Sequence, residues 1–337
     1  MTTGPGVGPL DDSFVWPGSV DSRAVGYIEG DLGGANRRDV EAWRALRILP
    51  RVLRDVTRVS TEWQHDGLTF ASPILVAPWA SQTFVHPEGE KATSHGAASA
   101  GVPFVLSSNS ATRVVDLPAD GAPFWSQLYV PPRREDILPY LKASQDAGAL
   151  GFVVTVDAPT VPVDFSFRSP IRDIAPPSVN FRDGVMPAVA ADLSVADFAW
   201  IHEVTGLPVL AKGVLAAEDA AMLVEAGVDG IIVSNHGGRQ LGAVVTTSSV
   251  LASVAGAVAG RAPVWVDGGI RSGEDVFRAL ALGASAVLVG RPAARALVEG
   301  ASGVEAVLDE LRVQLHTAMT MAGAATLADI SRSHLAS

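Results

Sequence analysis

The chain has no cysteine among its 337 residues. This absence excludes disulfide bonds, thiolate catalysis and metal sites with cysteine ligands. Basic residues are also scarce, because 25 Lys and Arg stand against 36 Asp and Glu, which gives a formal net charge of −11 at pH 7. Nucleic-acid binding depends on clustered Lys and Arg that neutralise phosphates, so we expect no nucleic-acid partner.

The sequence also lacks targeting signals and long apolar runs. The first residues, MTTGPGVGPLDDSF, have neither the basic start nor the apolar stretch of a secretory signal. No apolar stretch is long and unbroken enough to span a bilayer, so no membrane association is expected. Hydrophobic residues make up 48% of the chain, which is enough for a large core. We therefore expect a soluble, cytoplasmic protein.

One pattern repeats along the chain: a helical stretch, a glycine, a short turn, and an apolar run that ends in polar residues. EAGVDGIIVSNHGG, at 225–238, is an example. The apolar runs are typical of strands buried on both faces, as in a parallel sheet. The glycines of the pattern suit the left-handed conformation that closes a helix; they are Gly101, Gly148, Gly206, Gly227, Gly260 and Gly283.

Together with PILVAP (73–78) and FWSQLYV (124–130), the pattern gives eight strands. Helices are expected between most of them, at 88–100, 134–148, 216–227 and 272–283. Eight such units over roughly 220–250 residues are typical of a TIM (β/α)8 barrel. A doubly wound open sheet is the alternative, although such sheets usually have fewer strands.

We therefore predict one α/β domain in two parts. Residues 1–70 form an N-terminal segment that covers one end, and residues 71–337 form the barrel. The proline-rich stretch 158–193, after the fourth strand, is too long for an ordinary turn, and we interpret it as an active-site loop.

Polar residues follow every predicted strand. In a TIM barrel the carboxyl ends of all strands open onto one face, where the active site lies. The polar residues expected to converge there are Ser107, Gln127, Tyr129, Thr155, Asp157, Lys212, Ser234, His236, Arg239, Asp267, Arg271 and Arg291.

The last two strands are followed by DGGIRSG (267–273) and VGRP (289–292), which combine glycine N–H donors with two arginines. In many barrels a phosphate binds the loops after strands seven and eight, so we predict a phosphate site. The alternative is that these glycines only form tight turns.

The opposite side of the predicted site carries acid–base residues. His236 is a candidate general base, with Asp157 as the carboxylate that stabilises its charged form. Arg239 suits a bidentate carboxylate. Lys212 is compatible with a Schiff base, as in barrel aldolases, and equally with electrostatic stabilisation of a negative charge.

The motif SNHGGRQL (234–241) closely resembles the signature of the FMN-dependent 2-hydroxy acid oxidases and dehydrogenases, a family that includes glycolate oxidase, lactate oxidase, mandelate dehydrogenase and 4-hydroxymandelate oxidase. The likeness starts near Gly26 and covers most of the chain. It extends through YIEG, APWA, HPEGE, VLSS, QLYV, TVDAP, AKGVL, DGGIRSG and LVGRP to ISRSHL. The resemblance implies an FMN enzyme that oxidises a small 2-hydroxy acid to the 2-oxo acid and forms a homotetramer.

The resemblance also implies catalytic roles. His236 would take a proton from the substrate while Asp157 supports its charge, and Arg239 would pair with the substrate carboxylate. Tyr27 and Tyr129 would hydrogen-bond the substrate. The oxidised carbon would lose its hydrogen to flavin N5, either as a hydride or through a carbanion.

The same resemblance implies a cofactor site. Lys212 would lie near flavin N1 and stabilise the reduced ring, and Asp267 would bind the ribityl chain. The isoalloxazine would rest against Ala77, Pro78, Trp79 and Ala80. Polar contacts to the ring would come from Ser107, Gln127, Thr155 and Ser234. The phosphate end would comprise Gly268, Gly269, Arg271, Gly290 and Arg291.

The chain departs from the family at substrate-facing positions. Val163 and Asp164 stand where the family has loop arginines, and an aspartate there would repel an anionic substrate. Arg168 would substitute only if the loop refolds. Three further departures are Asn109 in place of a tryptophan, Gly242 in place of an aspartate, and Trp79 at a small-residue position.

These departures predict a substrate larger than glycolate or lactate, aromatic or derivatised. The main alternative is an FMN enzyme that acts on a non-acidic alcohol, an amine or a masked acid in a biosynthetic pathway. An aldolase or isomerase of a phosphorylated substrate, with a Schiff base on Lys212, and a non-catalytic flavin-binding protein are further alternatives. The electron acceptor is left open among oxygen, a quinone and a carrier protein.

Overall fold

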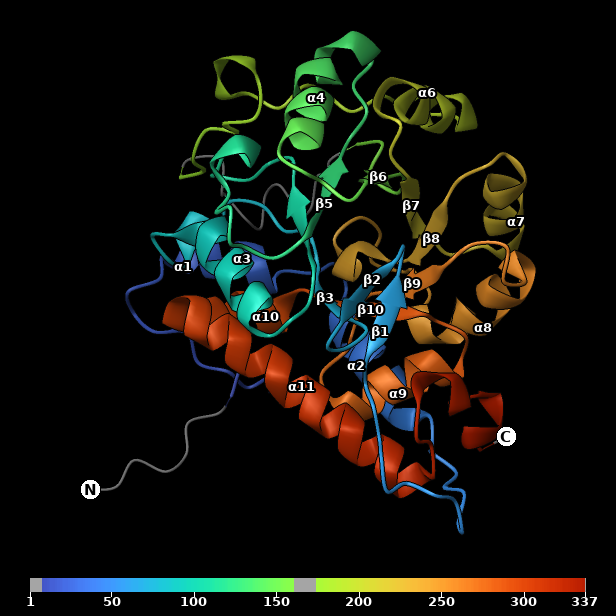
Figure 1. The fold of residues 1–337 in the computed structure, drawn as a ribbon. Helices are drawn as coiled ribbons and strands as arrows, with labels where there is room; N and C mark the ends of the chain where they lie inside the picture. Colours follow the sequence, from blue (N-terminus) through green and yellow to red (C-terminus); the bar gives the residue numbers. More distant parts are fainter. Residues whose placement is uncertain (1–7, 161–173, 337) are drawn as a thin grey trace.

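The computed structural model describes residues 8–160 and 174–336 and is built around a closed barrel of eight parallel strands (Figure 1). The strands are β3 (Ile74–Val76), β4 (Phe104–Ser107), β5 (Phe124–Leu128), β6 (Phe152–Thr155), β7 (Val209–Val214), β8 (Gly230–Val233), β9 (Val264–Val266) and β10 (Ala286–Val289). Each strand pairs with its neighbours in the chain, and β10 closes the ring on β3. The TIM barrel prediction is confirmed, and the closed ring rules out the open sheet.

Helices surround this barrel (Figure 1). They are α3 (Gly89–Ser99), α4 (Leu138–Asp146), α6 (Val195–Thr205), α7 (Ala217–Glu225), α8 (Thr247–Val258), α9 (Gly273–Ala281), α10 (Arg291–Ala296) and α11 (Gly300–Ala322). The four predicted helices are confirmed as α3, α4, α7 and α9. The six predicted helix-closing glycines all adopt positive φ, between 67° and 103°. Within the described residues, no helix is both long enough and apolar enough to cross a membrane.

The barrel interior places the site directly above an apolar layer. Each strand contributes one large residue to that layer: Leu75, Val105, Trp125, Val153, Leu210, Ile232, Trp265 and Leu288. Because side chains alternate along a strand, the residue two positions farther on points to the same side. Those residues are Ala77, Ser107, Gln127, Thr155, Lys212, Ser234, Asp267 and Gly290. These residues, which include cofactor positions predicted from the sequence, therefore form the next layer of the barrel interior toward the carboxyl ends of the strands.

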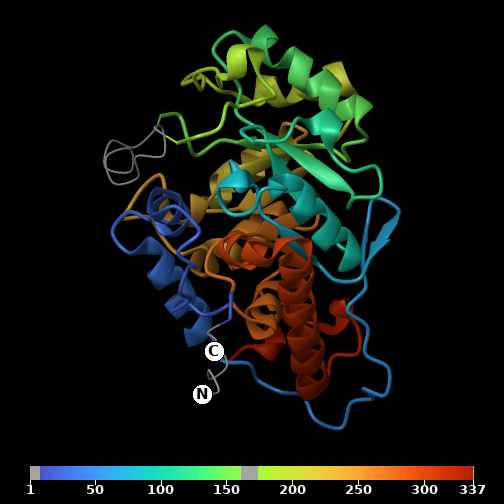
Figure 2. The ribbon, with the colours of Figure 1, turned by 90° about the vertical axis from the view of Figure 1, so that its left-hand side faces the viewer.

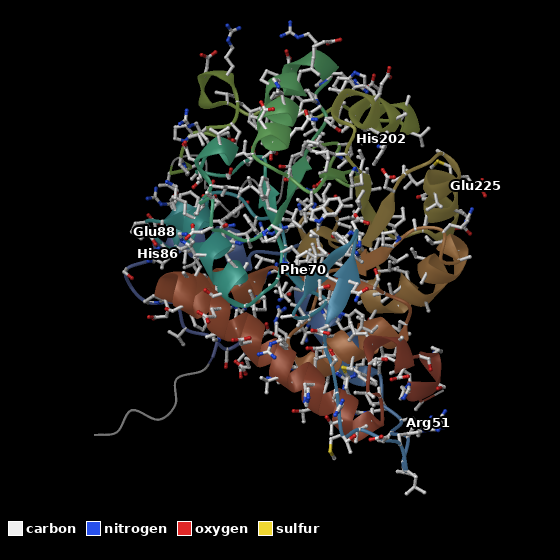
Figure 3. All side chains as sticks on the ribbon, viewed as in Figure 1. Arg51, Phe70, His86, Glu88, His202 and Glu225 are labelled. Atoms are coloured by element: carbon white, nitrogen blue, oxygen red, sulfur yellow. The ribbon has the colours of Figure 1, made fainter. Side chains whose placement is uncertain are left out.

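The N-terminal residues cover both ends of the barrel, whereas the sequence predicted one. The hairpin of β1 (Trp63–His65) and β2 (Leu68–Phe70) packs Trp63 and Phe70 against the interior cluster, and Figure 3 labels Phe70 there. The helices α1 (Ser22–Glu29) and α2 (Ala35–Ala45) lie at the opposite end, which Figure 2 shows on the left. These helices cover the end where the strands terminate in polar residues.

Two side chains of α2 tie that helix to the loops after β8 and β9. The Trp43 indole Nε1 donates to the Gly268 carbonyl at 2.8 Å. The Asp39 carboxylate, 1% exposed, accepts from the Asn235 amide at 2.7 Å and from the Thr247 backbone N–H at 3.2 Å. The cover helix therefore fixes the backbone on which the site is built.

Asp39 generates a prediction about stability and pH. Burial, together with the Asp267 carboxylate, raises the pKa of Asp39 to about 6, against the hydrogen bonds from Asn235 and Thr247. The folded state therefore binds this proton more tightly than the unfolded chain does. The resulting stabilisation is fully present below the ordinary value of 3.8 and is lost as pH rises through about 6.

We expect the free energy of unfolding of the wild type, relative to that of Asp39→Asn, to fall by about 2 kcal/mol between pH 4.5 and pH 7. Denaturant titrations of both proteins at the two pH values measure this difference. The exposed carboxylate of Asp146, changed to Asn, is the control and should show no comparable pH dependence. A difference between wild type and Asp39→Asn that stays constant with pH contradicts the prediction.

Candidate active site

The carboxyl ends of the strands surround one cleft of about 1000 Å³. The predicted residues that line it are Tyr27, Ala77, Pro78, Trp79, Ala80, Ser107, Gln127, Tyr129, Thr155, Lys212, His236, Arg239, Asp267, Gly268, Gly269, Arg271, Gly290 and Arg291. Asp157 and Ser234 are not part of the lining but hydrogen-bond to residues that are. The predicted loop residues Val163, Asp164 and Arg168 lie outside the described residues.

His236 and Asp157 form the acid–base pair of the cleft. His236 Nδ1 lies 3.0 Å from Asp157 Oδ1, across two strand ends. Burial by itself raises the pKa of Asp157, but the charge and hydrogen bond of His236, with the charge of Lys212, leave it below its usual value. An ionised carboxylate only accepts hydrogen bonds, so Nδ1 carries the proton and the Nε2 lone pair is left to act as a base.

The loop after β8 holds His236 in an unusual backbone conformation. Its φ is 58°, in the left-handed region that non-glycine residues seldom adopt. The Asn235 side chain accepts from the Gly237 N–H at 3.1 Å, and Ser234 Oγ accepts from the His236 N–H at 3.1 Å. These two contacts keep the imidazole turned toward Asp157, and Asp39 in turn orients the Asn235 amide.

The Asp157 carboxylate fits beside His236 because β7 contains a glycine. Gly213 has φ 108°, and a Cβ added there would lie 2.5 Å from Asp157 Cγ. No larger residue fits both the backbone conformation and the close approach. Gly213 thus leaves room for Asp157 beside His236.

Arg239 and the two tyrosines form a second cluster in the cleft. The Arg239 guanidinium stacks 4.7 Å from the centre of the Tyr27 ring and donates to the carbonyls of Tyr27 and Ile28. Burial lowers the pKa of Arg239 and raises that of Tyr129. At neutral pH the tyrosine is therefore a hydrogen-bond donor beside a fixed cation, which is a suitable arrangement for a carboxylate.

Lys212 is held by neighbours from the next strands. Its Nζ atom lies 2.8 Å from Ser234 Oγ and 3.0 Å from Asp267 Oδ2, and the residue is 4% exposed. Gln127 Nε2 donates to Thr155 Oγ1 at 2.9 Å, and Thr155 is the register partner of Lys212 on the adjacent strand β6. A cation therefore lies beside neutral polar groups on the floor of the cleft.

Two arginines occupy the end near β9 and β10. Arg271 and Arg291 both donate to Asn36 Oδ1, at 2.9 and 3.0 Å, and Arg291 also donates to the carbonyls of Gly30 and Gly237. Burial, followed by the charges of Arg239 and Arg271, lowers the pKa of Arg291 to about 9. This end of the cleft therefore has a strongly positive potential and favours an anion.

Sequence reasoning missed several residues that shape this end. Asn36 and Glu29 come from the cover helices, and Arg295 comes from α10. Arg295 pairs with Glu29 through two contacts of 2.7 and 2.8 Å. Arg295 lies more than 250 positions from Glu29 and Asn36 in the chain, and no local motif connects them. The only available signal was the arginine at position 295 inside an otherwise apolar stretch.

The residues of the cleft fit flavin mononucleotide. Asp267 Oδ1 and Arg291 Nε are buried without a hydrogen-bond partner among the described residues, so they are available to a hydroxyl and to a phosphate. A Cβ at Gly290 would meet only Ala77 Cβ, at 3.8 Å, so the backbone there is open to a close ligand. Ala77 and Pro78 line the cleft as an apolar wall for a planar ring.

Comparisons with known proteins agree with this chemistry. The family model described as FMN-dependent dehydrogenase matches residues 18–337. A peroxisomal (S)-2-hydroxyacid oxidase of Arabidopsis thaliana is 38% identical, with 92% of this chain and 91% of the relative covered. Glycolate oxidase 3 of Oryza sativa is 39% identical over 88% of this chain and 86% of the relative.

Among solved structures, an arginine-to-leucine variant of mandelate oxidase with 2-hydroxy-phenylacetamide superposes with a TM-score of 0.85. It is 37% identical and covers 92% of this chain and 93% of that chain. The family model spans nearly the whole sequence, and the relatives match over most of their length. The chain therefore belongs to the FMN-dependent dehydrogenase family.

Proposed function

We propose that this protein oxidises a 2-hydroxy acid to the corresponding 2-oxo acid with FMN as the electron acceptor. The observation that carries the proposal is the convergence in one cleft of a base pair, His236 with Asp157, and a carboxylate-binding cluster, Arg239 with two tyrosines. The named relatives, which oxidise 2-hydroxy acids, support the substrate class.

The residues divide the work as follows. Arg239 binds the substrate carboxylate, and Tyr27 and Tyr129 hydrogen-bond the substrate. His236 Nε2 removes a proton from the bound substrate, and the resulting imidazolium is stabilised by the Asp157 carboxylate at 3.0 Å. Fixed geometry matters here because a base must lie within hydrogen-bond distance of the proton that it removes.

FMN, when bound, would supply a two-electron acceptor for the substrate. The residues that would hold it all line the cleft and include Lys212, Gln127, Asp267, Arg271 and Arg291. The Lys212 ammonium would stabilise negative charge on the reduced ring. The two arginines would bind the phosphate.

The preferred substrate is larger than glycolate or lactate and carries an aromatic group or a masked acid. Trp79 and Asn109 line the cleft beside the residues proposed for the substrate, and the sequence has Asp164 where the family has a loop arginine. With fewer cations near the substrate, binding of a small dissociated acid relies on Arg239. The mandelate oxidase variant with an aromatic hydroxy amide supports a masked acid as the second candidate.

The surroundings of Lys212 argue against the aldolase alternative. A Schiff base requires a neutral amine whose lone pair attacks a carbonyl. Here the ammonium contacts Asp267 Oδ2 at 3.0 Å and Ser234 Oγ at 2.8 Å in a buried position. An ammonium held by a carboxylate has no lone pair to offer, so an electrostatic role for Lys212 is favoured.

The first prediction concerns substrate size. Stopped-flow reduction of the bound flavin, followed anaerobically, should be at least about tenfold faster with mandelate than with glycolate or lactate, because one well-filled apolar contact contributes that much discrimination. The same measurement with 2-hydroxy-phenylacetamide tests whether a masked acid is also a substrate. If glycolate reduces the flavin as fast as any larger compound, the proposed size preference is wrong.

The second prediction concerns the base pair. Asp157→Asn should lower the rate of flavin reduction about 100-fold or more, because the neutral amide no longer stabilises the imidazolium. Substrate affinity should change little, since Asp157 does not line the cleft. Asp146→Asn is the matched control on an exposed helix. A reduction rate within threefold of wild type for Asp157→Asn would count against His236 as the base.

The third prediction concerns the carboxylate anchor. Arg239→Lys should weaken binding of mandelate about tenfold to 100-fold, because lysine lacks the planar pair of donors. Binding of 2-hydroxy-phenylacetamide, which has no carboxylate, should be much less affected. Equal losses for the acid and the amide would show that Arg239 does not recognise the carboxylate.

A further inference from the structure

Residues 8–16, called here the N-terminal strap, lie over the arginine end of the cleft. Three of the contacts that attach it do not involve its acidic side chains. Arg295 Nη1 donates to the carbonyls of Asp11 and Pro9, at 2.8 and 3.3 Å. The Trp16 indole Nε1 donates to Glu29 Oε1 at 3.0 Å.

One side chain of the strap faces the arginines. Asp12 Oδ1 lies 2.8 Å from Arg271 Nε and 3.5 Å from Arg295 Nη1. The Arg271 side chain is 4% exposed and that of Asp12 is 36% exposed. A nearly buried guanidinium is thus paired with a carboxylate that reaches in from the surface.

The other hydrogen bonds of the Arg271 guanidinium are to neutral groups, whereas its backbone N–H donates to Asp275 Oδ2 at 3.0 Å. The guanidinium donates to the Ile270 carbonyl and to Asn36 Oδ1, each at 2.9 Å. Asp12 is therefore the group that neutralises its charge at hydrogen-bond distance among the described residues. Asp12 is absent from the residues that line the cleft, so it contacts Arg271 from outside while Arg271 itself lines the cleft.

We propose that Asp12 is a built-in counter-anion that neutralises Arg271 and thereby lowers the affinity of the cleft for the phosphate of FMN. The inference rests on the proposed position of that phosphate at Arg271 and Arg291. A phosphate monoester carries close to two negative charges at neutral pH and experiences the Asp12 carboxylate as a like charge. Before FMN binds, Asp12 also supplies the counter-charge that the buried Arg271 guanidinium requires.

Removing the Asp12 carboxylate has two effects, and both make the free energy of FMN binding more favourable. Without Asp12, the protein lacking FMN has a buried guanidinium with no counter-charge, which raises its free energy. The complex with FMN loses a repulsion. Both changes favour phosphate binding, and the strap keeps its attachment because two hydrogen bonds from Arg295 go to its main-chain carbonyls. Asp12 thus selectively weakens the binding of flavins that carry a phosphate.

The test compares Asp12→Asn with Asp11→Asn, which makes the same change in net charge one residue away. The Asp11 side chain bonds to the Ser13 N–H and hydroxyl rather than to an arginine. Dissociation constants for FMN and for riboflavin are measured on the full-length apoprotein by quenching of flavin fluorescence. Asp12→Asn should tighten FMN about three- to tenfold and leave riboflavin unchanged. Asp11→Asn should change neither constant by more than about twofold.

Two results overturn the proposal. One is unchanged or weaker FMN binding by Asp12→Asn, which would mean that Asp12 serves only to orient Arg271. The other is equal tightening of FMN and riboflavin, because such an effect would not involve the phosphate.

Arg271→Gln separates this proposal from the position of the phosphate. If Arg271→Gln weakens FMN strongly and riboflavin little, the phosphate position stands, and the Asp12 variant alone decides the inference. If Arg271→Gln affects FMN and riboflavin alike, the phosphate position itself is wrong and the inference fails with it.

Discussion

The structure depends on the burial of cations at one end of the barrel. Lys212, Arg271 and Arg295 are 3–5% exposed, and Arg239 and Arg291 lie beside them in the cleft. Buried charges destabilise a fold unless each has partners, so every one of these side chains must be matched. Anionic ligands would complete the match, and this is how a chain with a net charge of −11 can bind anions in this cleft.

The N-terminal cover follows from the same constraint. Strand ends alone cannot supply enough acceptors, and the missing ones come from Glu29, Asn36, Asp12 and the carbonyls around α1. The cover also reaches the acid–base side of the cleft, because Asp39 orients the amide that supports the His236 turn. The cover segment is therefore part of the site, and substitutions at these positions should change cofactor binding and catalysis as well as stability.

Local patterns predicted the fold well because a barrel of this kind repeats one short unit, and apolar runs and helix-closing glycines mark each repeat. The polar residues at the strand ends also predicted which side chains share the cleft. These patterns could not predict the contacts of Asp39 or Asp12, since their partners lie about 200 or more positions away. The left-handed turn at His236 was equally invisible, because it depends partly on Asp39, which lies outside the motif and orients Asn235. The oligomeric state stays a prediction.

The most direct test of the central claim is an anaerobic titration of the FMN-loaded protein with mandelate, followed in the visible spectrum. The account predicts a yellow protein whose flavin absorbance is bleached completely by about one equivalent of the hydroxy acid, with the 2-oxo acid as product. A yellow protein that no 2-hydroxy acid or hydroxy amide can bleach would contradict the assignment of the cleft to hydroxy acid oxidation.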